Sequence, residues 1–268
     1  MTSQASAYVG RTPQPFSDDA LALQFAAGNK DRLRYVAAWG RWLRWDDTRW
    51  RFDETLVAID LARRVCRDEA AKCNDSKVAK AVASGATVAA VERLARADHR
   101  LAATTGQWDA DPWLLNTPGG IVDLRTGELR PVRLEDYCTK ITAVAPEGDC
   151  PVWLAFLRRV TGNDDELIKF LQRGCGYALT GITREHALFF FYGTGANGKS
   201  VLLGTVAGIL ADYHTTAPIE TFVASNVGHH PTDLDRTPGG APCHRGGDGR
   251  GPAMGRGEDQ GANWRGQD

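Results

Sequence analysis

The feature that most constrains this chain is an octapeptide at residues 193–200 that follows the pattern G-x-x-x-x-G-K-S in full. Its members are Gly193, Thr194, Gly195, Ala196, Asn197, Gly198, Lys199 and Ser200. An uninterrupted apolar run at 187–192 precedes the octapeptide, and apolar residues at helical spacing follow it. We expect a strand buried on both faces, a phosphate-binding loop and a helix, in that order. The sequence therefore predicts an α/β nucleotide-binding domain around this loop.

Each residue type in the loop suits phosphate chemistry. Glycines at 193, 195 and 198 let backbone N–H groups turn inward around a β-phosphate. A helix beginning near Lys199 adds partial positive charge at its N-terminus. Lys199 is expected to reach the β- and γ-phosphates, and the Ser200 hydroxyl to ligate Mg²⁺. We therefore expect ATP and Mg²⁺ as cofactors, with Lys199 and Ser200 as the catalytic residues.

Two alternatives accompany this interpretation. A glycine-rich turn could spell the pattern by chance, although the strand and helix expected around it argue against that. A phosphate loop also does not by itself separate helicases from kinases and other NTPases. A small kinase would need a lid over its acceptor substrate, and the sequence shows none.

The chain before the loop has a mixed α+β pattern. Residues 1–17 are expected to form a flexible lead-in, and Ser17 a helix cap for an apolar stripe that includes Leu33 and Val36. Residues 39–53 alternate aromatic and polar side chains around Asp46-Asp47, which predicts a β-hairpin. Further expected elements are helices at 54–67, 76–83 and 88–97, a strand–turn–strand unit at 121–129, and helices starting at Pro151 and after Asn163.

These patterns predict an α+β N-terminal domain at 18–150, followed by an incomplete α/β P-loop NTPase domain at 151–234. After Leu234 the composition changes: residues 236–268 hold ten of the 29 glycines and no Val, Ile, Leu, Phe or Tyr. Such a segment cannot bury a core, so we expect a disordered C-terminal tail at 235–268.

Residues 167–223, centred on Phe-Phe-Phe-Tyr-Gly-Thr-Gly-Ala-Asn-Gly-Lys-Ser, resemble superfamily 3 helicases of phage and plasmid primases. Asn197 before Gly-Lys-Ser is typical of that group, and the residues at 180–181, 184–186 and 219–222 also fit. The upstream region, most recognisably 39–43 and 116–124, resembles the poxvirus- and phage-type domain that precedes this helicase. The resemblance implies a homo-oligomeric ring that hydrolyses ATP between subunits and unwinds DNA at a replication origin.

The family places an acidic strand that polarises Mg²⁺ where the glycine-rich tail stands. Back-translation from Asp235 with one base dropped permits an apolar strand ending in an acidic residue, followed by an amphipathic segment. Our hypothesis is a frameshift at or just before Asp235. The alternative is a genuine Gly/Arg tail that binds nucleic acid. Asp233 is the nearest acid, but it lies in a polar turn, so we expect little or no helicase activity from the chain as written.

Composition sets the remaining expectations. The formal net charge of −1 neither favours nor excludes nucleic acid, so any basic surface must be local. The six cysteines form no Cys-x-x-Cys pair and the histidines lack metal-ligand spacing, so no zinc site is expected. Without a secretory leader or a long apolar run, we expect a cytoplasmic protein without a membrane partner.

Three groups of side chains have both a functional and a structural interpretation. The Trp and Arg residues at 39–51 could form a stacking platform for single-stranded DNA, but packing against neighbouring helices is favoured. Asp164 and its neighbours are explained by helix capping. Asp123 and Glu128 are expected to be solvated loop carboxylates. For the whole chain, three functions remain open: a helicase fragment, another P-loop NTPase, and a remnant that binds nucleotide without catalysis.

Overall fold

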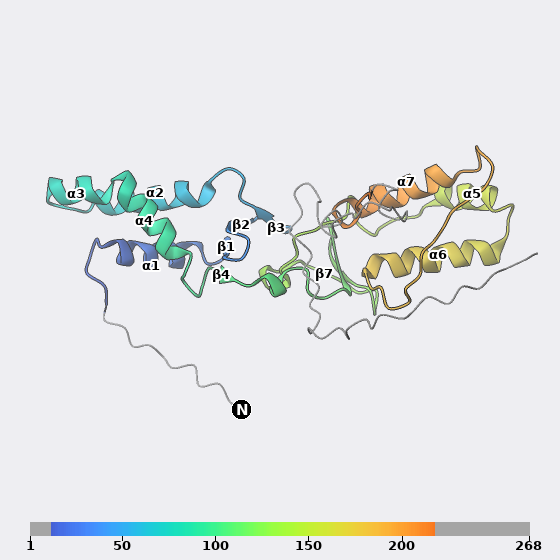
Figure 1. Cartoon of the computed structure of the whole chain (residues 1–268), viewed down its shortest axis with the longest axis horizontal. Coiled ribbons are helices and arrows are strands. Elements are labelled where there is room, and N and C mark those ends of the chain that lie inside the picture. Colours follow the sequence, from blue (N-terminus) through green and yellow to red (C-terminus); the bar gives the residue numbers. More distant parts are fainter. Residues whose placement is uncertain (1–11, 218–268) are drawn as a thin grey trace, which may run out of the picture.

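The structure, a computed structural model, describes residues 12–217. Its first half combines four helices with a four-stranded sheet (Figure 1). The helices are α1 (Asp18–Asn29), α2 (Val57–Ala70), α3 (Ser76–Val82) and α4 (Gly85–Ala95). The strands are β1 (Leu33–Val36), β2 (Arg41–Trp45), β3 (Trp50–Phe52) and β4 (Ala102–Ala103). The strand order is β3-β2-β1-β4, with β4 parallel to β1 and the other pairs antiparallel.

Local sequence signals explain the first helices. The Ser17 hydroxyl accepts the backbone N–H of Ala20 at 3.2 Å, which caps α1 as expected. Asp75 and Ser84 cap α3 and α4 in the same way. Leu33 and Val36, which the sequence analysis assigned to the apolar stripe of the first helix, lie instead in β1. Both remain fully buried, because alternate strand residues face the helices and the aromatic core in turn.

Two apolar cores hold this half together. Phe25, Ala62 and Val91 belong to the larger one, where α1, α2 and α4 pack on one another. The smaller one is aromatic and surrounds the fully buried Trp50. Trp50 stacks against Tyr137 and donates its indole N–H to the Leu134 carbonyl at 3.0 Å. The β-hairpin expected at 39–53 is confirmed, with Trp45 opposite Trp50 across its turn.

A second, three-stranded antiparallel sheet continues the chain, in the order β5-β6-β7. Its strands are β5 (Leu114–Thr117), β6 (Gly120–Asp123) and β7 (Leu129–Arg130). Gly120 opens β6 at φ +126°, and a Cβ there would collide with the Arg130 carbonyl, so only glycine fits. The short 3₁₀ turns η1 (Thr105–Gln107) and η2 (Leu134–Asp136) flank this sheet in sequence.

Three more helices and a final turn complete the described chain. They are α5 (Pro151–Val160), α6 (Asp165–Thr180), α7 (Lys199–Leu210) and the 3₁₀ turn η3 (Ala211–Tyr213). Figure 1 shows them at the opposite end of an elongated molecule from α1–α4, with β5–β7 between the two groups. They bury little: Leu157 and Leu202 are their only buried apolar residues in the described part. The described residues thus form a mixed α+β structure whose core is concentrated in the first half.

Candidate functional site: the loop at residues 193–200

Two glycines fix the shape of the loop. Gly193 adopts φ +148°, and a Cβ there would lie 2.6 Å from Asn197 Nδ2. Gly198 adopts φ +84°, and its added Cβ would lie 2.6 Å from Val160 Cγ1 and 3.2 Å from the Phe156 ring. Both positions therefore favour glycine for backbone conformation, and Gly198 also requires it for space. Val160 and Phe156 of α5 thus lie directly against the backbone of Gly198, so α5 supports the loop.

The helix expected after the loop is present. α7 begins at Lys199, with Gly198 as its N-cap and no side chain capping its first turn. The N–H groups at a helix start have no partner within the helix and carry the positive end of the helix dipole. These donors therefore lie directly beside the loop, which is the arrangement that binds phosphate groups in proteins.

The Lys199 ammonium group lies over the loop. Its Nζ donates to Asn197 Oδ1 at 2.7 Å, to the Gly193 carbonyl at 3.2 Å and to the Thr194 carbonyl at 3.4 Å. All three acceptors are oxygens of the loop itself, and these bonds are solvent-exposed. A phosphate oxygen could replace them without leaving a buried group unpaired. The loop and its lysine are thus brought together as the sequence predicts.

The apolar run at 187–192 does not form the expected buried strand. Its residues are in no helix or strand, and Leu188, Phe190 and Tyr192 are about 77–83% exposed. Phe189 contacts α6, with its ring 6.0 Å from that of Phe170 and 3.5 Å from where a Cβ at Gly174 would lie, and Phe191 is half-buried. The physical reason is that a strand needs a hydrogen-bonded neighbour, and no strand pairs with this run within residues 12–217.

The turn η3, which directly follows α7, is attached to earlier parts of the chain by contacts that the sequence analysis missed. Tyr213 Oη accepts the backbone N–H of the fully buried Asn116 at 3.0 Å. Asp212 accepts the Ile141 N–H at 3.1 Å and forms an ion pair with Arg49. Such partners lie about 70 to 160 residues apart, so no local pattern could reveal them. The helix that starts at the loop is therefore followed by a turn that contacts β5 and its neighbouring segments.

The remaining candidate residues have structural roles. Trp42 and Trp50 are buried and stack on other aromatic side chains, which confirms the packing interpretation for them. Asp164 caps α6 by accepting the Leu167 N–H at 3.0 Å, as expected. Asp123 pairs with Arg125 at 2.8 Å, and this guanidinium lowers the pKa of its carboxyl. In the described range, no three His, Cys, Asp or Glu side chains are grouped to hold a metal ion.

The resemblance of the upstream region can now be compared with known families. The D5 N terminal like family matches residues 22–162, which is more than half of the chain. The chain belongs to this family. The matched region runs from within α1 to the end of α5 and includes both sheets, and it supports membership of the phage and plasmid primase-type replication proteins. The comparison with curated proteins finds no match.

The match ends at residue 162 and does not include the loop at 193–200. The residues at 219–222, the histidines at 229 and 230, Asp233 and the tail at 235–268 lie outside the described residues, as do residues 1–11. The frameshift hypothesis therefore stays a prediction. None of the helices at 12–217 is long and apolar enough to cross a membrane.

Proposed function

We propose that the chain binds ATP at residues 193–200 as part of an ATP-dependent DNA helicase of phage or plasmid replication. The observation that carries the proposal is the start of α7 at Lys199, directly after a loop in which Gly193 and Gly198 adopt backbone angles that favour glycine. Membership of the D5 N terminal like family supports the replication context. More specifically, we propose that this helicase belongs to superfamily 3.

When a nucleotide binds, its phosphate oxygens would replace the loop oxygens that Lys199 Nζ now contacts. The free N–H groups at the start of α7 would donate to the same phosphates. Ser200, the second residue of α7, would offer its hydroxyl to Mg²⁺, and the phosphates would supply further oxygen ligands. The metal would contribute charge neutralisation at the transferred phosphoryl group.

A second candidate is nucleotide binding without catalysis. In the described part of the chain, no Asp or Glu side chain forms a hydrogen bond or ion pair with residues 193–200. An acidic side chain normally holds Mg²⁺ in such sites together with the loop hydroxyl. We therefore propose that the chain as written binds ATP and hydrolyses it slowly or not at all.

DNA and identical subunits are the proposed partners. The half of the molecule that carries the loop exposes large apolar side chains, including Val152, Phe190 and Leu203. Contiguous exposed apolar surface is typical of an interface with further protein. A ring of identical subunits is the form of this interface that the family resemblance implies.

Nucleotide binding is tested by titrating a fluorescent ATP analogue into the full chain and into Lys199→Ala. We expect at least about a tenfold loss of affinity, because a charge-assisted contact to phosphate contributes about 1.5–3 kcal/mol. Lys169→Ala on α6 is the matched control, since its ammonium pairs with Glu166 at 2.9 Å on an exposed surface. Equal binding by the Lys199→Ala variant would overturn the proposed site.

Catalysis is tested by ATP hydrolysis with and without single-stranded DNA, on this chain and on a version restored by the one-base shift at Asp235. Hydrolysis by the restored protein alone supports the helicase assignment and the frameshift together. Turnover by the chain as written that depends on Lys199 would contradict the frameshift hypothesis. Robust strand displacement by the chain as written would refute its proposed inactivity.

A further inference from the structure

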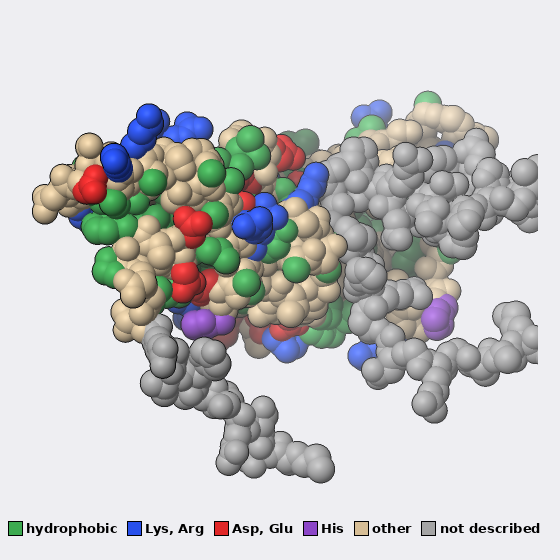
Figure 2. Space-filling model, turned by 60° about the vertical axis from the view of Figure 1, so that its left-hand side comes forward, with side chains coloured by type: hydrophobic (Ala, Val, Ile, Leu, Met, Phe, Trp, Pro, Cys, Tyr) green, Lys and Arg blue, Asp and Glu red, His purple; other side chains and the backbone are tan. Residues whose placement is uncertain are grey.

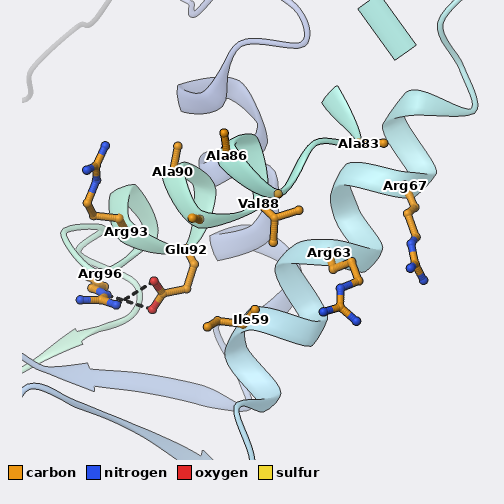
Figure 3. Close-up of a pocket in the computed structure, with 12 residues that line it drawn as sticks. Ile59, Arg63, Arg67, Ala83, Ala86, Val88, Ala90, Glu92, Arg93 and Arg96 are labelled. Carbon is orange, nitrogen blue, oxygen red and sulfur yellow. Dashed lines mark hydrogen bonds and ion pairs between the residues drawn. The ribbon is translucent and has the colours of Figure 1, made fainter. Parts of the chain in front are cut away.

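A groove of about 660 Å³ lies between α2 and α4, far in sequence from the nucleotide loop. Ile59 of α2 and Val88 of α4 lie between the two helices and contribute apolar surface (Figure 3). Small residues, Gly85 and Ala86, line it where α4 begins. The groove is therefore apolar inside, and its borders are formed by long side chains.

Those borders are basic. Arg63 and Arg67 extend from α2, whereas Arg93 and Arg96 come from α4 (Figure 3). Glu92 is the only acidic residue that lines the groove, so four positive charges and one negative charge give a net charge of +3. Figure 2 shows Lys and Arg side chains gathered along the upper edge of this helical half, with hydrophobic side chains between them. A chain with a net charge of −1 thus carries a local positive surface.

The charge is available to a ligand. Arg96 binds the Glu92 carboxylate at 2.8 Å, and this pair is neutral. Arg67 and Arg93 form no ion pair within the described part of the chain, and both are exposed. Arg63 is 3.9 Å from Asp60, which pairs more closely with Arg64 at 2.7 Å. Packing of α2 on α4 does not require these three arginines, because that contact is made by the apolar core.

The spacing suits a polymer with repeated phosphates. Arg63 and Arg67 are four residues apart on one helix, which places them about 6 Å apart along its axis. Guanidinium groups bind phosphate through two parallel N–H donors, a geometry that lysine cannot provide. The first turn of α4 adds free backbone N–H groups at Gly85 and Ala86, beyond the Ser84 cap that accepts the Thr87 N–H at 3.1 Å.

We propose that this groove, bordered by Arg63, Arg67 and Arg93, binds the backbone of single-stranded DNA. The choice of DNA rests on the replication context of the proposed function. A single strand is favoured over a duplex because its unpaired bases can lie on the apolar surface around Ile59 and Val88 while its phosphates contact the arginines. A duplex keeps its base faces stacked inside and would leave that apolar surface uncovered.

The test is fluorescence anisotropy with a labelled 20-nucleotide oligothymidine and the full chain, without nucleotide, over a range of salt concentrations. Arg67→Ala/Arg93→Ala should weaken binding about tenfold at 0.1 M salt. The slope of log K against log salt should fall by roughly 1.4, since each lost single-strand phosphate contact accounts for about 0.7. The Lys pair, Arg67→Lys/Arg93→Lys, should keep the wild-type salt slope because it keeps both charges, but it should bind more weakly than the wild type because lysine lacks the two parallel donors. Arg173→Ala/Arg184→Ala, exposed arginines outside the groove, is the matched control.

The result that overturns the proposal is equal binding by the wild type and Arg67→Ala/Arg93→Ala, or no binding by the wild type. Tighter binding of a 20-base-pair duplex, or equal competition by polyglutamate, would also overturn it, because either excludes recognition of a single strand. Lys199→Ala should bind the oligonucleotide normally. The proposed nucleotide site is therefore tested by ATP-analogue binding to Lys199→Ala, and the proposed groove by oligothymidine binding to Arg67→Ala/Arg93→Ala, so each proposal can fail without the other.

Discussion

Tyr213 Oη accepts the backbone N–H of Asn116 at 3.0 Å, so the turn η3, which directly follows the helix that begins at the nucleotide loop, is attached to the first strand of the second sheet. Asn116 is fully buried, and its side-chain amide donates to the Thr48 and Lys140 carbonyls, each at 2.9 Å. Three segments far apart in the sequence therefore meet at one asparagine. This junction joins the region matched by the D5 N terminal like family to the segment that carries the loop.

Tyr213→Phe is expected to destabilise this junction. The Asn116 N–H would lose its acceptor inside the protein, which costs about 1–3 kcal/mol of unfolding free energy. Urea denaturation at pH 7 measures this loss. Tyr177→Phe is the matched control, because its hydroxyl accepts the Glu185 N–H at 3.3 Å on an exposed surface. Equal stability of Tyr213→Phe and the wild type would contradict the structural role of the phenol.

The same tyrosine predicts a pH dependence. Burial raises the pKa of the Tyr213 phenol above its ordinary value, so the native state keeps a proton that the unfolded chain releases near pH 10. The stabilisation by Tyr213 is complete below pH 10 and is lost as the pH rises further. The stability difference between the wild type and Tyr213→Phe should therefore shrink as the pH rises above 10. A constant difference would exclude this phenol as the cause.

Gly198→Ala tests the support of the nucleotide loop by α5. The substitution places a methyl group at 2.6 Å from Val160 Cγ1 at a backbone φ of +84°, and both effects oppose the loop conformation. We expect at least about a tenfold loss of ATP-analogue affinity. Gly204→Ala on α7 is the control, since nothing lies within 4 Å of its Cβ position and alanine favours a helix by about 1 kcal/mol. Normal nucleotide binding by Gly198→Ala would show that the loop has another conformation.

Phe189→Ala and Phe190→Ala distinguish the observed extended run from the buried strand that the sequence predicts. Phe189 contacts Phe170 and α6, whereas Phe190 is 79% exposed. We expect Phe189→Ala to lower the unfolding free energy by about 1–2 kcal/mol and Phe190→Ala to change it by less than about 0.5 kcal/mol. Thermal denaturation of both variants measures the difference. A large cost, about 3–5 kcal/mol, for both would indicate a strand buried on two faces.

Whether an element could be predicted from the sequence depends on how far apart in the chain its interacting residues lie. The caps Ser17 and Asp164, the hairpin at Trp45 and Trp50 and the loop at 193–200 depend on neighbours in sequence, and each is visible in the sequence. β1 could not be predicted in this way, because Leu33 and Val36 fit the apolar stripe of a helix as well as they fit a strand. Its strand conformation is decided by pairing with β2 and β4.

The errors in the site have the same cause. An apolar run such as 187–192 predicts a strand only if a partner strand lies beside it, and a single sequence contains no information on that partner. The junction of Tyr213 with Asn116, and the arginines that α2 and α4 bring to one groove, depend on contacts between distant segments. The start of α7 after the loop and the positive φ angles of Gly193 and Gly198 could therefore be predicted, whereas the attachment of the loop to the rest of the molecule could not.

The final prediction concerns Glu92, which joins the core to the basic groove. Its buried carboxylate accepts the Trp42 indole N–H at 2.5 Å and binds Arg96 through two hydrogen bonds, at 2.8 and 2.9 Å. Glu92→Gln keeps the shape of the side chain but removes its charge, so stability should fall by about 1–3 kcal/mol. The same change raises the net charge of the groove lining from +3 to +4, because Arg96 is no longer neutralised. We therefore expect tighter binding of the oligothymidine, with a steeper salt dependence by roughly 0.7. Weaker or unchanged DNA binding by a folded Glu92→Gln variant would show that Arg96 does not contribute to the proposed DNA surface.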